Sequence, residues 1–580
     1  MVNTLQPINL TDWTGGLNLR RNQFQLADNE SPDMLNVDVD PRGGFCTRKG
    51  WLRWNDADIV DLDTIAWMPH NAAVHNLADG NQIVYVVNGA DHKIHSTGAG
   101  TRVFAPLNIT ANATPHCGDF APWGDYMYIA CGAANPAYRR LRDGTPQQLA
   151  NTFSEIEAPT PATFPRANYA CGHGGYMFCA STIEAGASYP ARIRWSHPGK
   201  PDSWRDGDYL DIEQMGGRIT GIMSFRDHLL IFKTNSLWAL YGYSDDSWQL
   251  IKVAMAVGCP SITCATRSET AVYFFSSSNK GGIYGYSGEA PVYISEQIRP
   301  ALEEVTAFNA VFVSWAGRRL WIAVPWMKNG GATVEPSSVF IFDPDIGNGA
   351  WSMYNSVVGT ISPVVDAADV DSRYPLTALW SDQTAAMVVL DRLDEGAYDA
   401  ILEPSVLGTS DGAYLSTGAG QDLAVTGRDP PGEAFDSYYR TRWLHAGWPD
   451  RKKSWRRPTF VVRQVPQDVD LIVESFRNYN ETEIHRTRTL RVEATGSNYW
   501  TPTGFAEANV GGFDWTPGGE NDPTGTGADW GPQQQGSNLI RAGSMGLARS
   551  IQMRIRPSPT TMRKWGVDGI VAKIKMRRFR

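Results

Sequence analysis

The chain has few side-chain arrangements that could support catalysis or hold a metal ion. His92 and His95 lie three residues apart, but no third ligand follows at a zinc-like spacing. Asp343, Asp345 and Gly347 begin like a calcium loop but lack the remaining ligands and the terminal Glu. We therefore expect these two aspartates to shape a turn after a strand rather than bind a cation.

Three nearby carboxylates, Asp206, Asp208 and Asp211, could pair as the acid and base of a glycosidase. That chemistry needs a defined distance between two carboxyl groups, and a sequence does not give it. The Ser-x-Asp-x-Gly-x-Thr-Trp box of sialidase propellers is absent, and Ser244–Trp248 is a poor partial match.

The cysteines fit a packing role. Cys171, His173 and Cys179 lie around the start of a predicted strand, and Cys259 and Cys264 form a close pair that we predict to be buried. Seven scattered cysteines are typical of reduced thiols in protein cores. The motifs GxGxxG, GxxxxGK[ST], HExxH and GxSxG are all missing. We therefore predict no catalytic residues, no metal ion and no cofactor.

The stretch Gly216–Tyr243 shows which elements organise the chain. It predicts strands at Arg218–Phe225, His228–Lys233 and Leu237–Tyr241, separated by short polar turns, and Ser247–Ile251 could pair as a fourth. A four-stranded antiparallel sheet of this kind is the blade of a β-propeller.

The same pattern recurs along the chain at intervals of roughly 43–53 residues for most steps, as expected for blades. The pattern repeats but the side chains do not, so we expect six or seven diverged blades. The other recurrences begin at Ile83–Val87, Gly124–Ala130, Gly175–Ala180, Glu269–Ser276 and Arg318–Pro325, with Thr384–Leu390 as a further candidate.

Composition agrees with a mainly β protein. The 580 residues are 42% hydrophobic and 19% charged, with 56 glycines, 35 prolines and 21 tryptophans. Few stretches show a helical period, and the best helix candidates are the short segments Ser295–Val305 and Ala434–Tyr439. The net charge of −9 argues against a general nucleic-acid coat. No apolar run is long enough for a membrane span, so we expect no stable membrane insertion. The N-terminus lacks the features of a secretory signal, so we expect the protein to stay in a cytoplasm or to leave by a route such as cell lysis.

The first 50 residues combine glycine pairs, a polar loop and a short strand. The defining residues are Gly15-Gly16-Leu17-Asn18, Leu26, the Asp28–Pro32 loop, Met34-Leu35-Asn36-Val37, Gly43-Gly44 and Arg48-Lys49-Gly50. We predict that Met34–Asp40 is a strand.

This arrangement resembles the N-terminal signature of bacteriophage tail proteins, most closely the tail nozzle, or tail tubular protein B, of short-tailed phages. The specific part covers about 40 residues, and the looser pattern about two thirds of the chain. Related propellers occur among the minor tail proteins of long-tailed phages, so the tail type stays open. The resemblance implies a virion tail location, assembly in the host bacterial cytoplasm and a ring of six copies.

We divide the chain into an N-terminal signature arm (1–55), a β-propeller (56–402), a linker (403–434) and a C-terminal β domain (435–580). The last of these is expected to resemble a sandwich or barrel. It contains a long Gly-, Trp- and Pro-rich loop, 495–536, with Trp500, Trp515 and Trp530. Such a loop could act as an arm that packs on a neighbour.

The C-terminal domain is rich in basic residues. A channel through which DNA slides should not have a densely basic lining, because each phosphate contact adds binding free energy. We therefore predict that these residues contact an acidic partner at an assembly interface. The predicted interface residues are Arg451, Lys452, Lys453, Arg456, Arg457, Lys573, Lys575, Arg577, Arg578 and Arg580.

Two function classes follow. The first is a structural subunit of a tail nozzle or tail-tip ring, part of the channel for genome DNA. Its expected partners are copies of itself in a homohexamer, adjoining tail adaptor, tail-tip or fibre proteins, and the passing double-stranded DNA. The alternative is a host-surface glycan-binding or glycan-cleaving propeller of the tail. A row of exposed tryptophans around a pocket with two carboxylates would favour that alternative.

Overall fold

The computed structural model describes residues 6–22, 25–55, 69–88, 93–110, 118–132, 135–150, 165–212, 217–278, 281–328, 330–333, 336–355, 360–369, 372–381, 384–393, 398–399, 433–445, 451–463, 468–492, 538–558 and 564–576. The predicted loop 495–536 and nearly all of the predicted linker 403–434 lie outside these residues.

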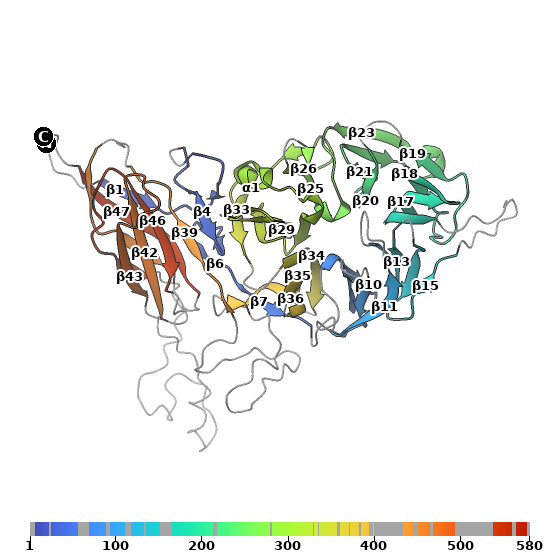
Figure 1. Ribbon diagram of the computed structural model, residues 1–580, viewed down its shortest axis with the longest axis horizontal. Helices are drawn as coiled ribbons and strands as arrows, with labels where there is room; N and C mark the ends of the chain where they lie inside the picture. The colour runs from blue at the N-terminus through green and yellow to red at the C-terminus, as the bar shows by residue number, and fades with distance from the viewer. Residues whose placement is uncertain are drawn as a thin grey trace, which may run out of the picture.

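Seven antiparallel four-stranded sheets follow one another around a ring, which confirms the predicted β-propeller and gives the number of blades (Figure 1). The innermost strand of the first blade, β8, contacts those of the second and seventh, β12 and β34, so the ring closes. In chain order the blades are β8–β11 (Pro69–Asn76, Gln82–Asn88, Lys93–Thr97, Phe104–Thr110), β12–β15 (Asp119–Trp123, Tyr126–Ala130, Tyr138–Leu141, Gln147–Gln148), β16–β19 (Arg166–His173, Tyr176–Glu184, Ala187–Trp195, Tyr209–Asp211), β20–β23 (Ile219–Phe225, His228–Lys233, Ser236–Tyr241, Gln249–Met255), β24–β27 (Ala265–Arg267, Val272–Ser276, Gly282–Tyr286, Val292–Tyr293), β28, β29, β32 and β33 (Phe312–Ala316, Arg319–Val324, Ser338–Asp343, Ala350–Tyr354), and β34–β36 with β7 (Thr360–Asp369, Ser372–Ser381, Thr384–Leu393, Gly50–Arg53).

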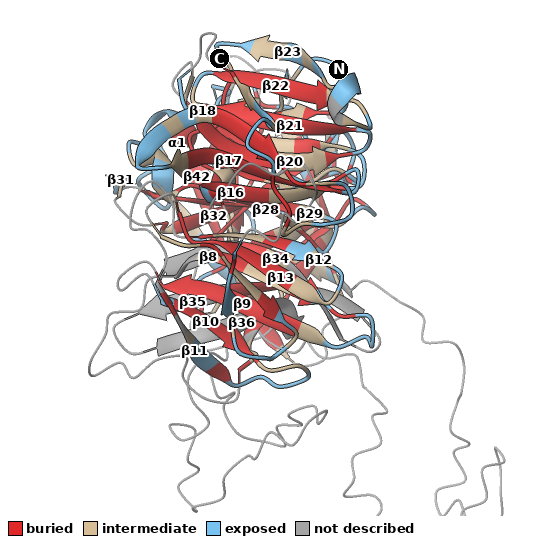
Figure 2. Ribbon diagram, turned by 90° about the vertical axis from the view of Figure 1, so that its right-hand side faces the viewer, coloured by how far each residue is buried: buried red, intermediate tan, exposed pale blue. Residues whose placement is uncertain are grey.

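The fourth blade matches its sequence pattern closely. Strand β21 has the predicted bounds, and all six of its residues are buried because blades pack on both of its faces. Figure 2 shows the buried colour running through β21 and β22 and giving way to exposed residues on the outer strand β23. That strand begins later than predicted because Asp245–Ser247 form a 3-10 turn, η1, and it continues to Met255.

The seventh blade is built from both ends of the propeller sequence. Thr384–Leu390, a candidate first strand of a blade, belongs instead to the third strand, β36. The outermost strand is β7, from residues 50–53, which pairs antiparallel with β36. Pairing between these distant segments closes the ring with a continuous ladder of backbone hydrogen bonds. It covers the edge of β36, which would otherwise be open.

Helical structure is sparse among the described residues. The predicted helix at Ser295–Val305 corresponds to a 3-10 turn, η4 (Glu296–Ile298), followed by α1 (Arg299–Glu303). The other candidate, Ala434–Tyr439, is wrong, because its ends belong to the strands Glu433–Ala434 and Tyr438–Arg440. The other short elements are η2 (Ile262–Cys264), η5 (Phe308–Ala310), the hairpin β30–β31 (Trp326–Met327, Gly331–Ala332) and the pair β37–β38 (Tyr398–Asp399, Glu433–Ala434). In the part of the chain that is described, no helix has the length and apolar character of a membrane span.

The C-terminal domain consists of two sheets around a shared core, in agreement with the predicted sandwich. One sheet has eight strands: β1 (Gln6–Leu10), β5 (Val37–Val39), β6 (Phe45–Thr47), β40 (Lys453–Trp455), β41 (Thr459–Val462), β44 (Asn538–Arg541), β45 (Gly546–Ala548) and β47 (Gly566–Met576). The other has five: β4 (Asp33–Leu35), β39 (Tyr438–Arg440), β42 (Val469–Arg477), β43 (Arg486–Val492) and β46 (Ile551–Pro557).

The N-terminal segment, which the division at residue 55 treats as a part of its own, contributes strands to both domains. It gives β1, β5 and β6 to one sandwich sheet, β4 to the other and β7 to the propeller. The predicted strand Met34–Asp40 is divided into β4 and β5 by Asn36, whose φ of 51° interrupts the extended backbone.

Candidate assembly interface

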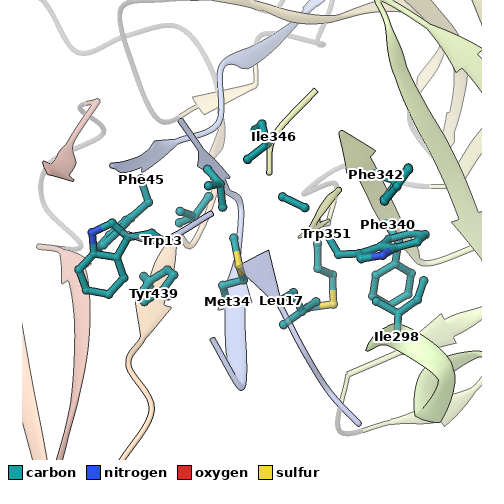
Figure 3. Close-up of a cluster of buried hydrophobic side chains, with 14 of the residues drawn as sticks. Trp13, Leu17, Met34, Phe45, Ile298, Phe340, Phe342, Ile346, Trp351 and Tyr439 are labelled. Atoms are coloured by element: carbon teal, nitrogen blue, oxygen red, sulfur yellow. The ribbon is translucent and has the colours of Figure 1, made fainter. Parts of the chain in front are cut away.

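The contact between sandwich and propeller is formed largely by the N-terminal segment. In Figure 3, Met34 and Leu17 lie between an aromatic group on the sandwich side and Trp351 of the propeller strand β33. The short strand β2 (Gly16–Leu17), which pairs with β3 (Glu30–Ser31), lies against β33. Gly16 has a φ of 61°, and a Cβ there would lie 2.6 Å from the Trp351 carbonyl oxygen. The signature glycine therefore allows a backbone approach that another residue would block.

The aromatic group on the sandwich side is tightly packed. Trp13 is 1% exposed, and its ring meets those of Phe45 and Tyr439 edge to face, with centroids 5.1 Å apart in each case. Phe45 stacks on Tyr439 at 4.2 Å. Residues from both ends of the chain thus form one core beside the propeller.

Asn36 connects four segments at this junction. Its backbone N–H donates to the Met353 carbonyl of the propeller, and its side-chain amide donates to the Asp436 carbonyl of the sandwich at 2.7 Å and to Asn355 Oδ1. Its Oδ1 accepts from Arg48 Nε at 3.1 Å. An asparagine suits this position because its side chain pairs as both donor and acceptor and it tolerates a positive φ.

Arg48 is fully buried at the same point. Beyond its bond to Asn36, Nη1 donates to the Lys49 carbonyl at 2.9 Å. The guanidinium also lies over the rings of Phe435, at 3.7 Å, and Trp51, at 4.4 Å. This arginine therefore has a structural role in which hydrogen bonds and aromatic faces replace its hydration.

Eight of the ten basic residues predicted as an assembly interface fall into three groups. The first group lies on the outer face of the eight-stranded sheet. Lys575 of β47 is paired with Ser454 of β40, and Lys573 lies two residues before Lys575 on the same face. Lys573 is exposed, and its carbonyl accepts the N–H of Arg456, which is exposed together with Arg457. These residues are accessible to a partner.

Lys453 forms the second group, and the structure contradicts its assignment to the interface. The residue is fully buried, and its ammonium donates to the carbonyls of Arg451 at 3.0 Å and Arg549 at 2.8 Å. It lies opposite Met576 on the inward face of β40, so it stabilises the sandwich instead of facing a partner.

The third group, Arg577, Arg578 and Arg580, lies outside the described residues, and its role stays a prediction. Arg451 is half-buried and Lys452 is exposed.

Apolar side chains interrupt the basic face. Leu547, which is opposite Ser454, is 42% exposed, and Leu539, on the edge strand β44, is 72% exposed. Arg541 is also exposed on β44. A surface that mixes leucine and basic side chains suits a protein partner better than a phosphate backbone alone.

Two further arginines of the C-terminal domain are engaged within it. Arg554 and Arg556 on β46 both pair with Glu474 on β42, with Arg554 Nε at 2.6 Å and Arg556 Nη2 at 2.9 Å from its oxygens. The Glu474 side chain is 3% exposed. Burial alone would raise its pKa, but the hydrogen bonds from Arg556 and Arg554 outweigh that and hold the pKa below its ordinary value.

Replacing Glu474 with Gln is expected to destabilise the sandwich by about 2 kcal/mol at pH 7, because charge-assisted hydrogen bonds are lost. Since the folded pKa is depressed, this stabilisation is present above about pH 4.5, the ordinary glutamate value, and is lost as the pH falls through the folded value. Urea unfolding at several pH values should therefore show the two proteins converging in acid. A constant difference down to pH 3 would contradict this assignment.

Three of the candidate carboxylates, Asp343, Asp345 and Asp211, make structural contacts. Asp343 Oδ1 accepts the N–H of Asp345 at 3.0 Å and its Oδ2 pairs with Arg319, so this loop is a turn, as predicted. Both carboxylate oxygens of Asp211 accept hydrogen bonds from Arg192 at 2.7 Å, so Asp211 is engaged in an ion pair. His95 is buried, and His92 lies outside the described residues. Within the described ranges, no three His, Cys, Asp or Glu side chains group as a metal site.

Cys259 and Cys264 are fully buried, as predicted. Cys179 is also buried, and Cys171 is partly buried. His173 is buried too, but it borders an open groove, which the pattern of the sequence did not indicate.

No protein-family model and no curated protein matches this chain. Similar solved structures include virginiamycin B lyase from Staphylococcus aureus, with 11% identity and a TM-score of 0.35, covering 67% of this chain and 99% of that chain. The WD40 domain of Pan2 from Neurospora crassa has 9% identity and a TM-score of 0.35, covering 60% and 95%. YCF48 bound to D1 peptide has 10% identity and a TM-score of 0.33, covering 62% and 98%. At these sequence identities and TM-scores, the similarity does not distinguish an enzyme from a binding protein.

The residues that sequence reasoning missed are those that depend on contacts between distant segments. In the sequence, Asn36 and Arg48 stand out only as parts of the signature, and no pattern indicates a role for Glu474. The burial of Arg48 has no complete local signal, because Asn355 and Phe435, more than 300 positions away, contribute to it.

Proposed function

We propose that this chain is a structural subunit of a bacteriophage virion tail, a nozzle or tail-tip ring protein that forms part of the channel for genome DNA. The ring would be homohexameric, assembled in the host bacterial cytoplasm, and would contact adjoining adaptor, tail-tip or fibre proteins. The role is mechanical, without catalysis, a cofactor or stable membrane insertion.

The observation that carries this proposal is the position of the signature segment. The residues that resemble phage tail proteins are those that join propeller and sandwich, through Gly16 against Trp351 and through the Asn36–Arg48 pair. A subunit that transmits force in a ring requires two domains held at a fixed angle, and a shared core with buried polar bonds supplies that rigidity.

Charge distribution supports contacts between copies. Residues 435–580 contain 23 Lys and Arg against 14 Asp and Glu, whereas residues 1–434 contain 29 against 47. The basic face of one sandwich therefore complements the acidic propeller portion of another copy. Contacts between different faces of identical subunits close into a ring when the rotation allows it.

The test is the assembly state of the purified full chain, measured by light scattering and by electron microscopy of single particles. A closed ring with a central channel supports the proposal. A chain that stays monomeric at high concentration and low salt, and does not enter tail particles when it is made with the other tail proteins, contradicts it.

Replacing Arg456, Arg457 and Lys573 with Ala is expected to weaken ring formation, most clearly at low salt, where ion pairs are least screened, while the chain still folds. Individual exposed ion pairs contribute only about 0–1 kcal/mol, but the same set is repeated at every subunit contact. The matched control replaces Arg142, Arg299 and Arg318, three partly exposed propeller arginines, with Ala. If the rings of the first variant are normal across a salt series and only genome retention fails, these residues bind DNA and the interface assignment is wrong.

A further inference from the structure

Three successive blades present a tight turn on the same face of the propeller. These turns join β12 to β13, β16 to β17 and β20 to β21. Because each joins an innermost strand to its neighbour, the turns lie side by side around the ring. Together with the turn after β22 they enclose an open groove of about 470 Å³. This volume is in the range of small-molecule sites.

The groove lies far from the sandwich. Its turns belong to the second, third and fourth blades, whereas the N-terminal segment contacts the sixth. Figure 1 shows the third blade, with β17, β18 and β19, at one end of the molecule and the sandwich at the other. In a ring with the sandwiches inside, the groove would face outward.

Two aromatic side chains border the groove. Tyr243 is 80% exposed, which is unusual for a large aromatic residue, although its backbone is fixed by a hydrogen bond from its N–H to Ser247 Oγ at 3.0 Å. Trp123 is half-buried, and a Cβ on Gly172 would lie 3.4 Å from its ring. The remaining lining includes five glycines, so a ligand can approach backbone and aromatic faces without obstruction by other side chains.

The polar groups of the groove carry no net charge at neutral pH. His173 Nδ1 lies 2.8 Å from Ser224 Oγ, and burial lowers the pKa of this imidazole, which favours its neutral form. Arg226 donates to the carbonyls of Ser287 at 2.9 Å and Thr270 at 2.8 Å. Among the described residues of the lining the one carboxylate is that of Asp227, which is exposed, and its negative charge offsets that of the arginine.

We propose that this groove binds a short neutral saccharide. The faces of Trp123 and Tyr243 suit the apolar C–H faces of sugar rings. Sugar hydroxyls both donate and accept, which matches the Ser224 hydroxyl, the His173 ring and the Asp227 carboxylate. A phosphate is disfavoured, because the lining arginine is already bound to two carbonyls and a carboxylate stands beside it.

The carboxylate content of the described lining also bears on whether the groove can cleave a bound saccharide. Glycoside hydrolysis of the usual kind requires two carboxyl groups across the scissile bond, and the described residues that line this groove supply one. The groove therefore binds saccharide without cleaving it. This inference rests on the groove alone, so its failure would leave the ring proposal unaffected.

The test uses the full-length protein and three neutral trisaccharides, maltotriose, cellotriose and triacetylchitotriose, in calorimetric titrations. At least one is expected to bind, and Tyr243→Ala and Trp123→Ala should each weaken that binding by about tenfold. Tyr243→Ala is the more informative change, because a side chain exposed to this degree contributes little to folding. The matched control is Tyr209→Ala, which removes a 42% exposed tyrosine on β19, outside the groove lining, and should leave binding unchanged.

Three results would overturn the proposal. They are no binding of any of the three sugars, binding by the Trp123→Ala/Tyr243→Ala double variant that equals that of the wild type, and weakening of binding by Tyr209→Ala as large as that by Tyr243→Ala. Selective binding of a trimethyllysine peptide in place of sugar would also overturn it, and would show that Asp227 and the aromatic rings bind a cation. Release of shorter sugars during the titration would contradict binding without cleavage.

Discussion

A chain that lacks Met1–Lys49 is expected to lose its folded sandwich. This deletion removes β1, β5 and β6 from the eight-stranded sheet and β4 from the five-stranded sheet. It also removes Trp13, Leu17, Met34 and Phe45, each at most 1% exposed, from the shared core. Burial of one large side chain contributes about 1.5–3 kcal/mol, so the loss exceeds the whole stability of a typical domain once the strand pairings are included.

The propeller should respond differently, because the truncated chain keeps β7 and with it the closed seventh blade. Limited proteolysis followed by mass spectrometry should therefore show rapid cleavage within residues 435–580 and a resistant fragment from the propeller. A chain that begins at Gln6 keeps every described N-terminal strand and serves as the control. If the truncated sandwich were as resistant as that of the control, the N-terminal strands would be dispensable and this account of the signature would be wrong.

Replacing Arg48 with Ala is expected to lower the free energy of unfolding by about 3 kcal/mol or more. The change removes charge-assisted hydrogen bonds to Asn36 and Lys49 and leaves buried acceptors without that donor. It also removes the guanidinium between the rings of Phe435 and Trp51 and leaves a cavity there. Arg48→Lys should recover only part of the loss, since an ammonium cannot reproduce the planar, forked contacts.

Urea unfolding followed by tryptophan fluorescence is the measurement. Arg318→Ala is the matched control, because this arginine pairs with Asp345 at 3.0 Å but its side chain is 83% exposed. An exposed pair of this kind contributes less than about 1 kcal/mol. If Arg48→Ala and Arg318→Ala had equal effects, the proposed junction role of Arg48 would be contradicted.

The sequence by itself determined the repeated hairpins of the propeller. Strand β21, at His228–Lys233, could be predicted to the residue because it is a short apolar run between two polar turns, and such a pattern depends on neighbours in the chain. The turn role of Asp343 and Asp345 was predictable for the same reason. The burial of the Cys259 and Cys264 pair also followed from the local sequence, because small apolar side chains between strands are usually enclosed.

Only the tertiary structure decided how the two domains are joined. Strand β7 pairs with a strand more than 300 residues away, and nothing in residues 50–53 indicates which sheet edge will accept it. Lys453 belongs to a basic cluster in the sequence, yet it faces the core, where two carbonyls bind its ammonium. Asn36 looks like one residue of a strand, but contacts from both domains hold it at a positive φ. Sequence patterns report the periodicity of local structure, whereas these three outcomes depend on which distant backbone groups reach the same place when the core closes.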